Sequence, residues 1–176
     1  MQLKNIKISN FRNLTTQQIS FPCNLTYLVG DNGQGKTNLL EAIYLLGQGG
    51  SFRSIKNRDL HHWQNDNQVT SVEAEISTND GLKIIRYEIK ADKRIVYIND
   101  NRITKARDFY GVVPLVIFTP DDLQIIKGAP AKRRDFLDQI ISTLNTGYLE
   151  ASLAYERALK QRNEVIRQCK RESRRL

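Results

Sequence analysis

Long apolar runs are absent from this sequence of 176 residues. A helix that spans a bilayer needs about 20 consecutive apolar residues, and no stretch comes near that length. The opening residues, MQLKNIKISNF, alternate between apolar and polar side chains. Such alternation is typical of a half-buried strand and not of the apolar segment of a signal peptide. We therefore expect a globular protein located in the cytoplasm.

Cysteine and histidine are scarce as well. The two cysteines, Cys23 and Cys169, lie far apart with no C-x-x-C or Cys/His spacing, so neither a zinc site nor a disulfide framework is expected. His61 and His62 are adjacent, so their side chains point apart, and no third ligand accompanies them. Nothing resembles a Ser/His/Asp or Cys/His nucleophile. These absences argue against a metal centre built from cysteine or histidine.

Acidic residues are outnumbered by basic ones: 27 Lys and Arg against 19 Asp and Glu give a formal net charge of +8. The excess is concentrated in residues 160–176, which contain seven basic and two acidic residues. Such a segment favours nucleic acid or another polyanion as partner, although a helix rich in lysine and arginine is also commonly just a solvated face. On the first interpretation, DNA contacts Arg171, Arg174 and Arg175.

Short apolar runs bounded by turn residues predict strands in the first two thirds of the chain. The run VVPLVIF has the continuous apolar character of a central strand buried on both faces. From Thr119 onward the chain is expected to be helical. The predicted elements are strands at 2–9 and 18–29, the latter ending in a buried strand at 24–29, a helix at 36–46, a hairpin of 71–77 with 82–90, and strands at 94–100 and 112–118.

Two prolines mark helix starts in the last third of the chain. Pro120 and Pro130 fit the first position of a helix, where a missing N–H costs nothing. The helix that begins at Pro130 is expected to turn four apolar side chains inward. Heptad spacing after Tyr148 gives a stripe apolar enough for a partner helix. The four inward side chains are Phe136, Leu137, Ile140 and Ile141.

Between the strand at 24–29 and the helix at 36–46 the chain reads GDNGQGKT. This matches G-x-x-x-x-G-K-[ST], the phosphate-binding P-loop, in which glycines let successive backbone N–H groups point at an anion and the helix adds its positive end. The lysine reaches the β- and γ-phosphates, and the hydroxyl after it binds Mg²⁺. The predicted nucleotide-binding residues are Gly30, Asp31, Asn32, Gly33, Gln34, Gly35, Lys36, Thr37, which is also the Mg²⁺ ligand, and Asn38.

The nucleotide is expected to be ATP, because no Asn-Lys-x-Asp guanine motif is present. Hydrolysis also needs an aspartate that organises Mg²⁺ after an apolar strand and a group that positions water. Asp121 or Asp122 could serve, and the chain would then be a self-contained P-loop kinase or NTPase using Lys36 and Asp121. Alternatively TPDD simply starts a helix with Thr119 as its cap, which the following proline favours.

Five segments together resemble the RecF family of bacterial recombination and repair proteins. They are IKISNFRN, GDNGQGKTNLLEAIYLL, SFR, VIFTPDDLQIIKGAPAKRRDFLD and ERALKQRN. The resemblance covers essentially the whole chain, and the fourth segment is not a general feature of P-loop proteins. It implies an α/β P-loop NTPase fold of the ABC and SMC type. The first ATPase lobe, with a mixed sheet and an antiparallel subdomain, would occupy 1–118, and 119–176 would be a helical region leading into an incomplete arm.

The resemblance also implies site residues. It implies ATP and Mg²⁺ as cofactors and adds Arg12, which in similar heads reaches back to the nucleotide phosphates, here expected as a flexible peripheral contact. At the lobe junction, where such ATPases usually carry a glutamine, this chain has TPDD, which leaves Asp121, Asp122 or Gln124 as a second Mg²⁺ contact. The signature motif and the aspartate-glutamate pair lie further along in the family. We therefore expect an N-terminal fragment with no catalytic residue of its own.

The function implied by the resemblance is an ATP-dependent homodimer that binds DNA at gaps or junctions and assists RecA loading with RecR and RecO. ATP hydrolysis is expected of the complete protein. Two other classes stay open at this stage: the self-contained kinase, and a nucleotide-sensing interaction module with no enzymatic role. A reading frame that continues into a Ser-Gly-rich signature would end the kinase hypothesis.

Overall fold

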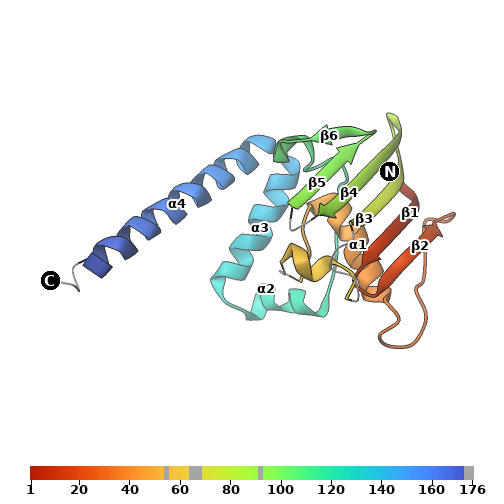
Figure 1. The fold of residues 1–176 in the computed structure, drawn as a ribbon, viewed down its shortest axis with the longest axis horizontal. Coiled ribbons are helices and arrows are strands. Elements are labelled where there is room, and N and C mark those ends of the chain that lie inside the picture. Colours follow the sequence, from red (N-terminus) through yellow and green to blue (C-terminus); the bar gives the residue numbers. More distant parts are fainter. Residues whose placement is uncertain (54–55, 64–68, 91–92, 173–176) are drawn as a thin grey trace. The chain divides into compact units, whose positions relative to one another are not determined.

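The computed structural model describes residues 1–53, 56–63, 69–90 and 93–172. The chain forms two compact units, Met1–Ile117 and Phe118–Leu176. The first contains a sheet and a helix, and the described part of the second contains only helices (Figure 1). In the part of the chain that the structure describes, no helix combines the length and the apolar character needed to cross a membrane.

A six-stranded antiparallel sheet forms the first unit, with the strand order β2-β1-β3-β4-β5-β6. The predicted hairpin and the strand after it are confirmed, whereas the short last strand was not predicted. The strands are β1 (Gln2–Phe11), β2 (Leu14–Ser20), β3 (Thr70–Thr78), β4 (Gly81–Lys90), β5 (Lys93–Ile98) and β6 (Asn101–Ile103).

Two-residue turns close two of the hairpins. Gly81 has φ 114° and pairs with Thr78, so the β3–β4 turn uses the Asn-Asp-Gly sequence as expected. Asn99 and Asp100 have φ 48° and 62°. Positive φ at both central residues is the property of a type I′ turn, whose twist suits an antiparallel hairpin. This turn brings β6 against β5.

The helix α1 (Lys36–Gln48) covers one face of the sheet (Figure 1). Alternate residues of the central strands are buried, which is the period-two pattern of a sheet with one covered face. Two short 3₁₀ helices, η1 (Asn57–Leu60) and η2 (Ala106–Asp108), lie outside the sheet. The core includes Ile6 and Ile8 of β1, Val72, Ala74 and Ile76 of β3, Ile85, Tyr87 and Ile89 of β4, and Leu39, Ala42, Leu45 and Leu46 of α1.

The two strands predicted to be most deeply buried are not strands. Neither 24–29 nor 112–118 has a regular hydrogen-bonding partner among the described residues, and neither belongs to the sheet. Val29 is 92% exposed and Val116 is 97% exposed. A strand is defined by its neighbours, so an apolar run without a partner strand stays irregular however strong its local preference. The segments that fold as predicted, α1 and the hairpin of β3 and β4, lie between these two runs in the sequence.

The second unit is a series of helices: η3 (Pro120–Leu123), α2 (Gln124–Lys127), α3 (Pro130–Leu144) and α4 (Thr146–Glu172). Both prolines occupy the helix starts predicted for them. Tyr148 of α4 hydrogen-bonds Asp138 of α3, which joins these two helices. That bond raises the pKa of the Tyr148 hydroxyl, because the carboxylate stabilises the protonated phenol.

The apolar side chains of α3 are not inward as predicted. Their exposed fractions range from 38% to 54%, so the described unit covers them only in part. The heptad stripe of α4 is also open to solvent, with Tyr155 67% exposed. Burial needs a partner surface, and periodicity alone does not supply one. The α3 side chains in question are Phe136, Leu137, Ile140 and Ile141.

Candidate nucleotide-binding site

The sequence 30–37 forms a loop that leads directly into α1. Gly33 and Gly35 have φ 82° and 96°, which side chains rarely allow. Gly35 is the residue before the helix, and its carbonyl accepts the first helical hydrogen bond, from Leu39 N–H at 2.8 Å. The first N–H groups of a 13-residue helix therefore point toward the loop. This is the arrangement that the P-loop sequence predicts.

Lys36 folds back over its own loop. Its Nζ donates to the carbonyl oxygens of Gly30 and Asp31, both at 2.7 Å. The ammonium group thus lies at the mouth of the loop, where a phosphate would meet it. Thr37 is exposed at the start of α1, and its hydroxyl is the P-loop position for Mg²⁺. Asp31, Asn32 and Gln34 are likewise exposed.

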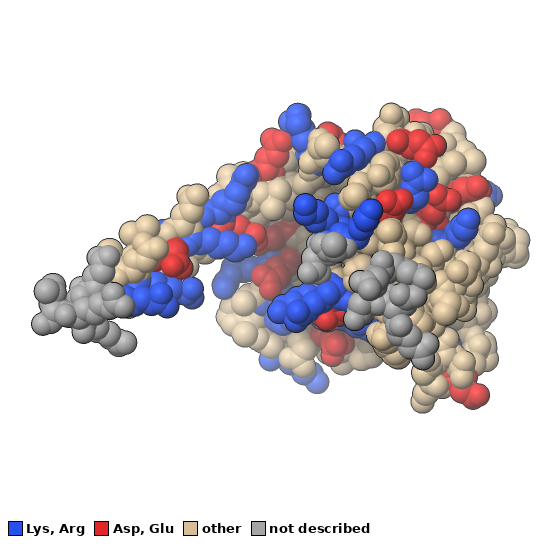
Figure 2. Space-filling model, viewed as in Figure 1, with Lys and Arg blue, Asp and Glu red and all other residues tan. Residues whose placement is uncertain are grey.

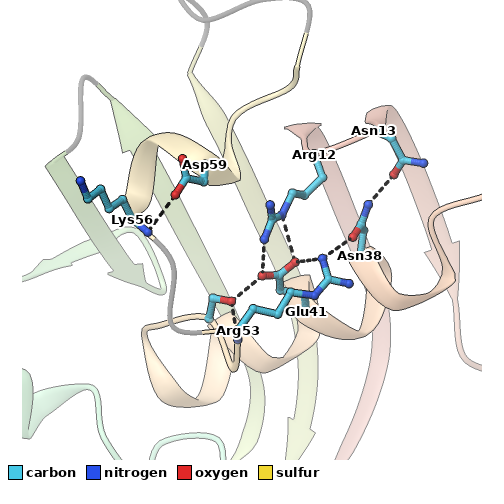
Figure 3. Close-up of polar contacts among 8 residues, drawn as sticks. Arg12, Asn13, Asn38, Glu41, Arg53, Lys56 and Asp59 are labelled. Atoms are coloured by element: carbon cyan, nitrogen blue, oxygen red, sulfur yellow. Dashed lines mark hydrogen bonds and ion pairs between the residues drawn. The ribbon is translucent and has the colours of Figure 1, made fainter. Parts of the chain in front are cut away.

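Arg12 is buried against Glu41 of α1 instead of being flexible and peripheral (Figure 3). Its Nη2 donates to Oε1 at 2.8 Å and its Nε donates to Oε2 at 3.1 Å. The Glu41 side chain is 0% exposed. Paired bonds between a guanidinium and a carboxylate restrict orientation as well as distance. The expectation of a mobile Arg12 side chain is therefore wrong, while its contact with a nucleotide stays a proposal.

Other polar residues extend this pair to the loop (Figure 3). Arg53 lies 3.3 Å from Glu41 and donates to Asn38 Oδ1 at 3.1 Å. Asn38 in turn donates to Asn13 Oδ1 at 2.7 Å, and Asn13 donates to the carbonyl of Gly33 at 2.9 Å. The side chain of Asn38, which was predicted to bind nucleotide, therefore holds Asn13, and Asn13 holds the loop backbone at Gly33.

Sequence reasoning did not assign roles to Asn13, Glu41, Ser51 or Arg53. A polar residue such as Glu41 on an otherwise buried helix face was the available signal, because a buried carboxylate requires a partner. The partners themselves are separated in sequence by 10 and more residues. Only the fold brings them to α1.

The acidic residues proposed for Mg²⁺ in the second unit have ordinary local roles or none. The Asp122 carboxylate accepts from the backbone N–H and the hydroxyl of Thr119, the latter at 3.0 Å. These bonds fit the alternative in which TPDD starts a helix with Thr119 as its cap. Asp121 and Gln124 are exposed. Nowhere in the described residues do three or more His, Cys, Asp or Glu side chains gather as a metal site.

Of the predicted DNA contacts, Arg171 lies exposed near the end of α4, where Figure 2 shows several basic side chains. Arg174 and Arg175 lie outside the described residues. His61 is buried, and its Nδ1 is 2.8 Å from Thr70 Oγ1. That hydroxyl donates to the carbonyl of Asn10 at 2.6 Å, so His61 donates to Thr70.

Comparison with known proteins decides the family. Residues 2–123 match the family model described as the RecF/RecN/SMC N terminal domain. The chain belongs to this family. The match contains the P-loop, Arg12 and Glu41, and it ends at the last residue of η3. The predicted resemblance to RecF and the ATPase head fold are thereby confirmed.

Individual RecF proteins agree with the family assignment. The chain is 38% identical over 171 residues to the DNA replication and repair protein RecF of Tropheryma whipplei. It is 39% identical over 168 residues to that of Leptospira interrogans serogroup Icterohaemorrhagiae serovar Lai. These alignments cover 97% and 95% of this chain, but 47% and 46% of the relatives. The chain thus spans about half the length of the RecF proteins it matches.

A solved RecF structure is similar throughout. The structure described as the recombination mediator protein RecF-ATP in the RecFOR pathway has a TM-score of 0.87 and 35% sequence identity. The similarity covers 94% of this chain and 44% of that one.

Proposed function

We propose that this chain binds ATP at the loop formed by residues 30–38. The observation that carries the proposal is the combination of positive-φ glycines, the start of α1 and the inward-folded Lys36 ammonium. Backbone N–H groups, a helix terminus and a cation all favour the same ligand, a polyphosphate. A phosphate that enters the loop would take over Lys36 from the carbonyls of Gly30 and Asp31.

Mg²⁺ would bind through Thr37 together with the phosphates and water. The hydroxyl is exposed at the first turn of α1, and Mg²⁺ prefers few protein ligands when phosphates are present. A second protein ligand could come from Asp121, Asp122 or Gln124, although the Asp122 carboxylate already accepts hydrogen bonds from Thr119. No catalytic residue is assigned to this chain, and multiple-turnover hydrolysis is not expected of it.

The biological role that fits best is DNA replication, repair and recombination. It is supported by membership of the family and by relatives named DNA replication and repair protein RecF. In the complete protein we propose ATP hydrolysis, ATP-dependent homodimerisation, binding to gapped or junction DNA and cooperation with RecR and RecO in RecA loading. The similar solved RecF protein is a recombination mediator of the RecFOR pathway, which supports the last of these.

Isothermal titration calorimetry with ATP and Mg²⁺ tests the nucleotide proposal. We expect one ATP per chain, weaker binding of ADP and none of AMP, because the loop and Lys36 recognise the β- and γ-phosphates. A phosphate-release assay accompanies it. Multiple turnovers that disappear in Asp121→Ala would support the self-contained NTPase instead, and AMP binding as strong as ATP binding would contradict the loop assignment.

A further inference from the structure

Glu41 is a buried carboxylate for which P-loop chemistry provides no role. It lies in α1, one helical turn after Thr37, with none of its side chain exposed. A buried ionised carboxylate is strongly destabilising unless it is paired. Glu41 is paired three times, with Arg12, with Arg53 and with the hydroxyl of Ser51. So many partners on one α1 side chain, next to the nucleotide loop, call for a functional explanation.

The pairing with Arg12 is specific in geometry. Both bonds use the edge of the guanidinium that carries Nε and Nη2, one to each oxygen of Glu41. This fork arrangement fixes the plane of the guanidinium. The pairing does not use Nη1, which has no hydrogen-bond partner among the described residues. A carboxylate that holds an arginine by one edge is well suited to orient the other edge toward an anion.

The backbone of Arg12 is also held in place. Its φ is 57°, a conformation that residues with a side chain rarely adopt. Its N–H donates to Leu60 O at 3.0 Å and its carbonyl accepts from Trp63 N–H at 3.2 Å. Backbone and guanidinium are therefore both constrained by the surrounding structure, which is how a strained residue persists at a functional site.

The residue after Arg12 connects this arrangement to the phosphate loop. Asn13 donates to the carbonyl of Gly33, and Asn38 links Asn13 to Arg53, which contacts Glu41. Hydrogen bonds and one ion pair thus connect the loop backbone to Glu41, and Figure 3 shows the part from Asn13 to Glu41. Arg53 also gives Glu41 a second positive partner.

We propose that Glu41 is a positioning residue of the nucleotide site, which holds Arg12 in the orientation needed to contact a phosphate. The inference rests on the proposed ATP binding and names the residue through which Arg12 takes part in it. Glu41 touches neither ligand nor metal. Its contribution to ATP affinity passes entirely through Arg12.

A double-mutant cycle on ATP affinity tests this. We compare Mg-ATP titrations of the wild type, Glu41→Gln, Arg12→Gln and the double variant. Glutamine keeps the shape of glutamate but removes the charge that fixes the guanidinium. We expect each single variant to bind ATP about tenfold more weakly, equivalent to about 1.4 kcal/mol. The double variant should bind no more weakly than Arg12→Gln, because the two residues act as one unit.

Ser51→Ala is the matched control. It removes a hydrogen bond to the same carboxylate but leaves the pairing with Arg12. It should lower the urea midpoint while ATP affinity stays within about twofold of the wild type. A purely structural role of Glu41 predicts that Glu41→Gln behaves in the same way, with lower stability and unchanged affinity.

Three results would overturn the proposal. They are a folded Glu41→Gln with wild-type ATP affinity, a double variant whose loss is the product of the two single losses, and a Ser51→Ala that loses as much affinity as Glu41→Gln. If Glu41→Gln alone does not fold, the double variant, in which two amides face each other, is compared with Arg12→Gln directly. Lys36→Ala distinguishes a failure of the Glu41 proposal from a failure of the proposed ATP binding. If Lys36→Ala keeps full ATP affinity, the proposed function itself is wrong.

Discussion

The Nζ of Lys36 lies 2.7 Å from the carbonyl oxygen of Gly30, so the cation of the P-loop is held by the first residue of its own motif. This bond places a positive charge at the loop mouth without a rigid support, because neither residue is buried. Lys36 can exchange a carbonyl for a phosphate at little cost, since a charged phosphate oxygen is the stronger acceptor.

Lys36→Ala should weaken ATP binding by about 10- to 100-fold, because a hydrogen bond to a charged group contributes about 1.5–3 kcal/mol. The free energy of unfolding should change by less than about 0.5 kcal/mol, since the side chain is partly exposed. Calorimetry and urea denaturation measure the two quantities. Lys83→Ala in β4 is the control, and equal ATP affinity of Lys36→Ala and this control would show that the loop assignment is wrong.

Gly35→Ala and Gly33→Ala form a matched pair within the loop. A Cβ at Gly35 would lie 2.7 Å from Leu14 Cδ2 and 3.0 Å from Asn13 Oδ1, whereas at Gly33 nothing lies within 4 Å. Both substitutions strain a positive φ by about 1 kcal/mol. Only the first displaces Asn13, which supports Gly33. We expect Gly35→Ala to destabilise the protein by about 1 kcal/mol more in urea denaturation, and the opposite order would contradict this packing.

Arg12→Ala should destabilise the protein by about 2–4 kcal/mol, because it removes one partner of a fully buried carboxylate. The retained partners Arg53 and Ser51 keep the cost below that of an isolated buried charge. Thermal and urea denaturation measure it. Arg58→Ala is the control, since its 3.9 Å pair with Asp59 is exposed and should contribute less than about 1 kcal/mol. Equal costs for the two variants would mean that the Glu41 pair is not buried in solution.

Because of Tyr87, we expect the free energy of unfolding to fall at alkaline pH. Burial in the core raises the pKa of its hydroxyl from 10.0 to about 12, with Arg94 opposing the shift, and the hydroxyl donates to Gly49 O at 2.9 Å. Because the folded state holds this proton more tightly, its contribution is complete below pH 10 and is lost as pH rises from 10 to 12. The loss should approach about 2–3 kcal/mol.

Tyr87→Phe isolates this effect from other groups that titrate in the same range. The variant loses a buried hydrogen bond and should be about 1 kcal/mol less stable at neutral pH. Between pH 10 and 12 its stability should fall less steeply than that of the wild type, as measured by urea denaturation at each pH. Parallel pH profiles for both proteins would show that Tyr87 ionises normally in the folded state.

DNA binding by the basic end of α4 should be weak, independent of sequence and strongly salt-dependent. A patch that engages roughly three to five phosphates gives a slope of log affinity against log salt of about −3 to −4. Replacing Arg171, Arg174 and Arg175 by glutamate should flatten it. Fluorescence anisotropy with a gapped duplex measures this, and Lys83→Glu with Arg102→Glu is the control in the first unit. If the slope of log affinity against log salt flattens in the Lys83→Glu/Arg102→Glu control and not in the triple variant, the DNA surface lies on the first unit.

Much of the fold could be predicted because the information is local. The P-loop, the α1 periodicity, the alternation in β3 and β4 and the prolines that begin η3 and α3 are each contained in one short segment. Backbone conformation follows largely from such local patterns, whereas burial of the apolar face also needs a partner surface. The loop for which we propose nucleotide binding belongs to this group, since its glycines and lysine lie within eight residues.

The sequence by itself determined the P-loop motif, the family and most of the antiparallel strands. The tertiary structure alone decided two other things. It left the apolar runs at 24–29 and 112–118 irregular, because a strand needs a hydrogen-bonding neighbour that no local pattern provides. It also brought Arg12, Arg53 and Ser51 to Glu41. The sequence shows that a buried glutamate would need partners. Which residues become those partners depends on how distant segments of the chain pack together.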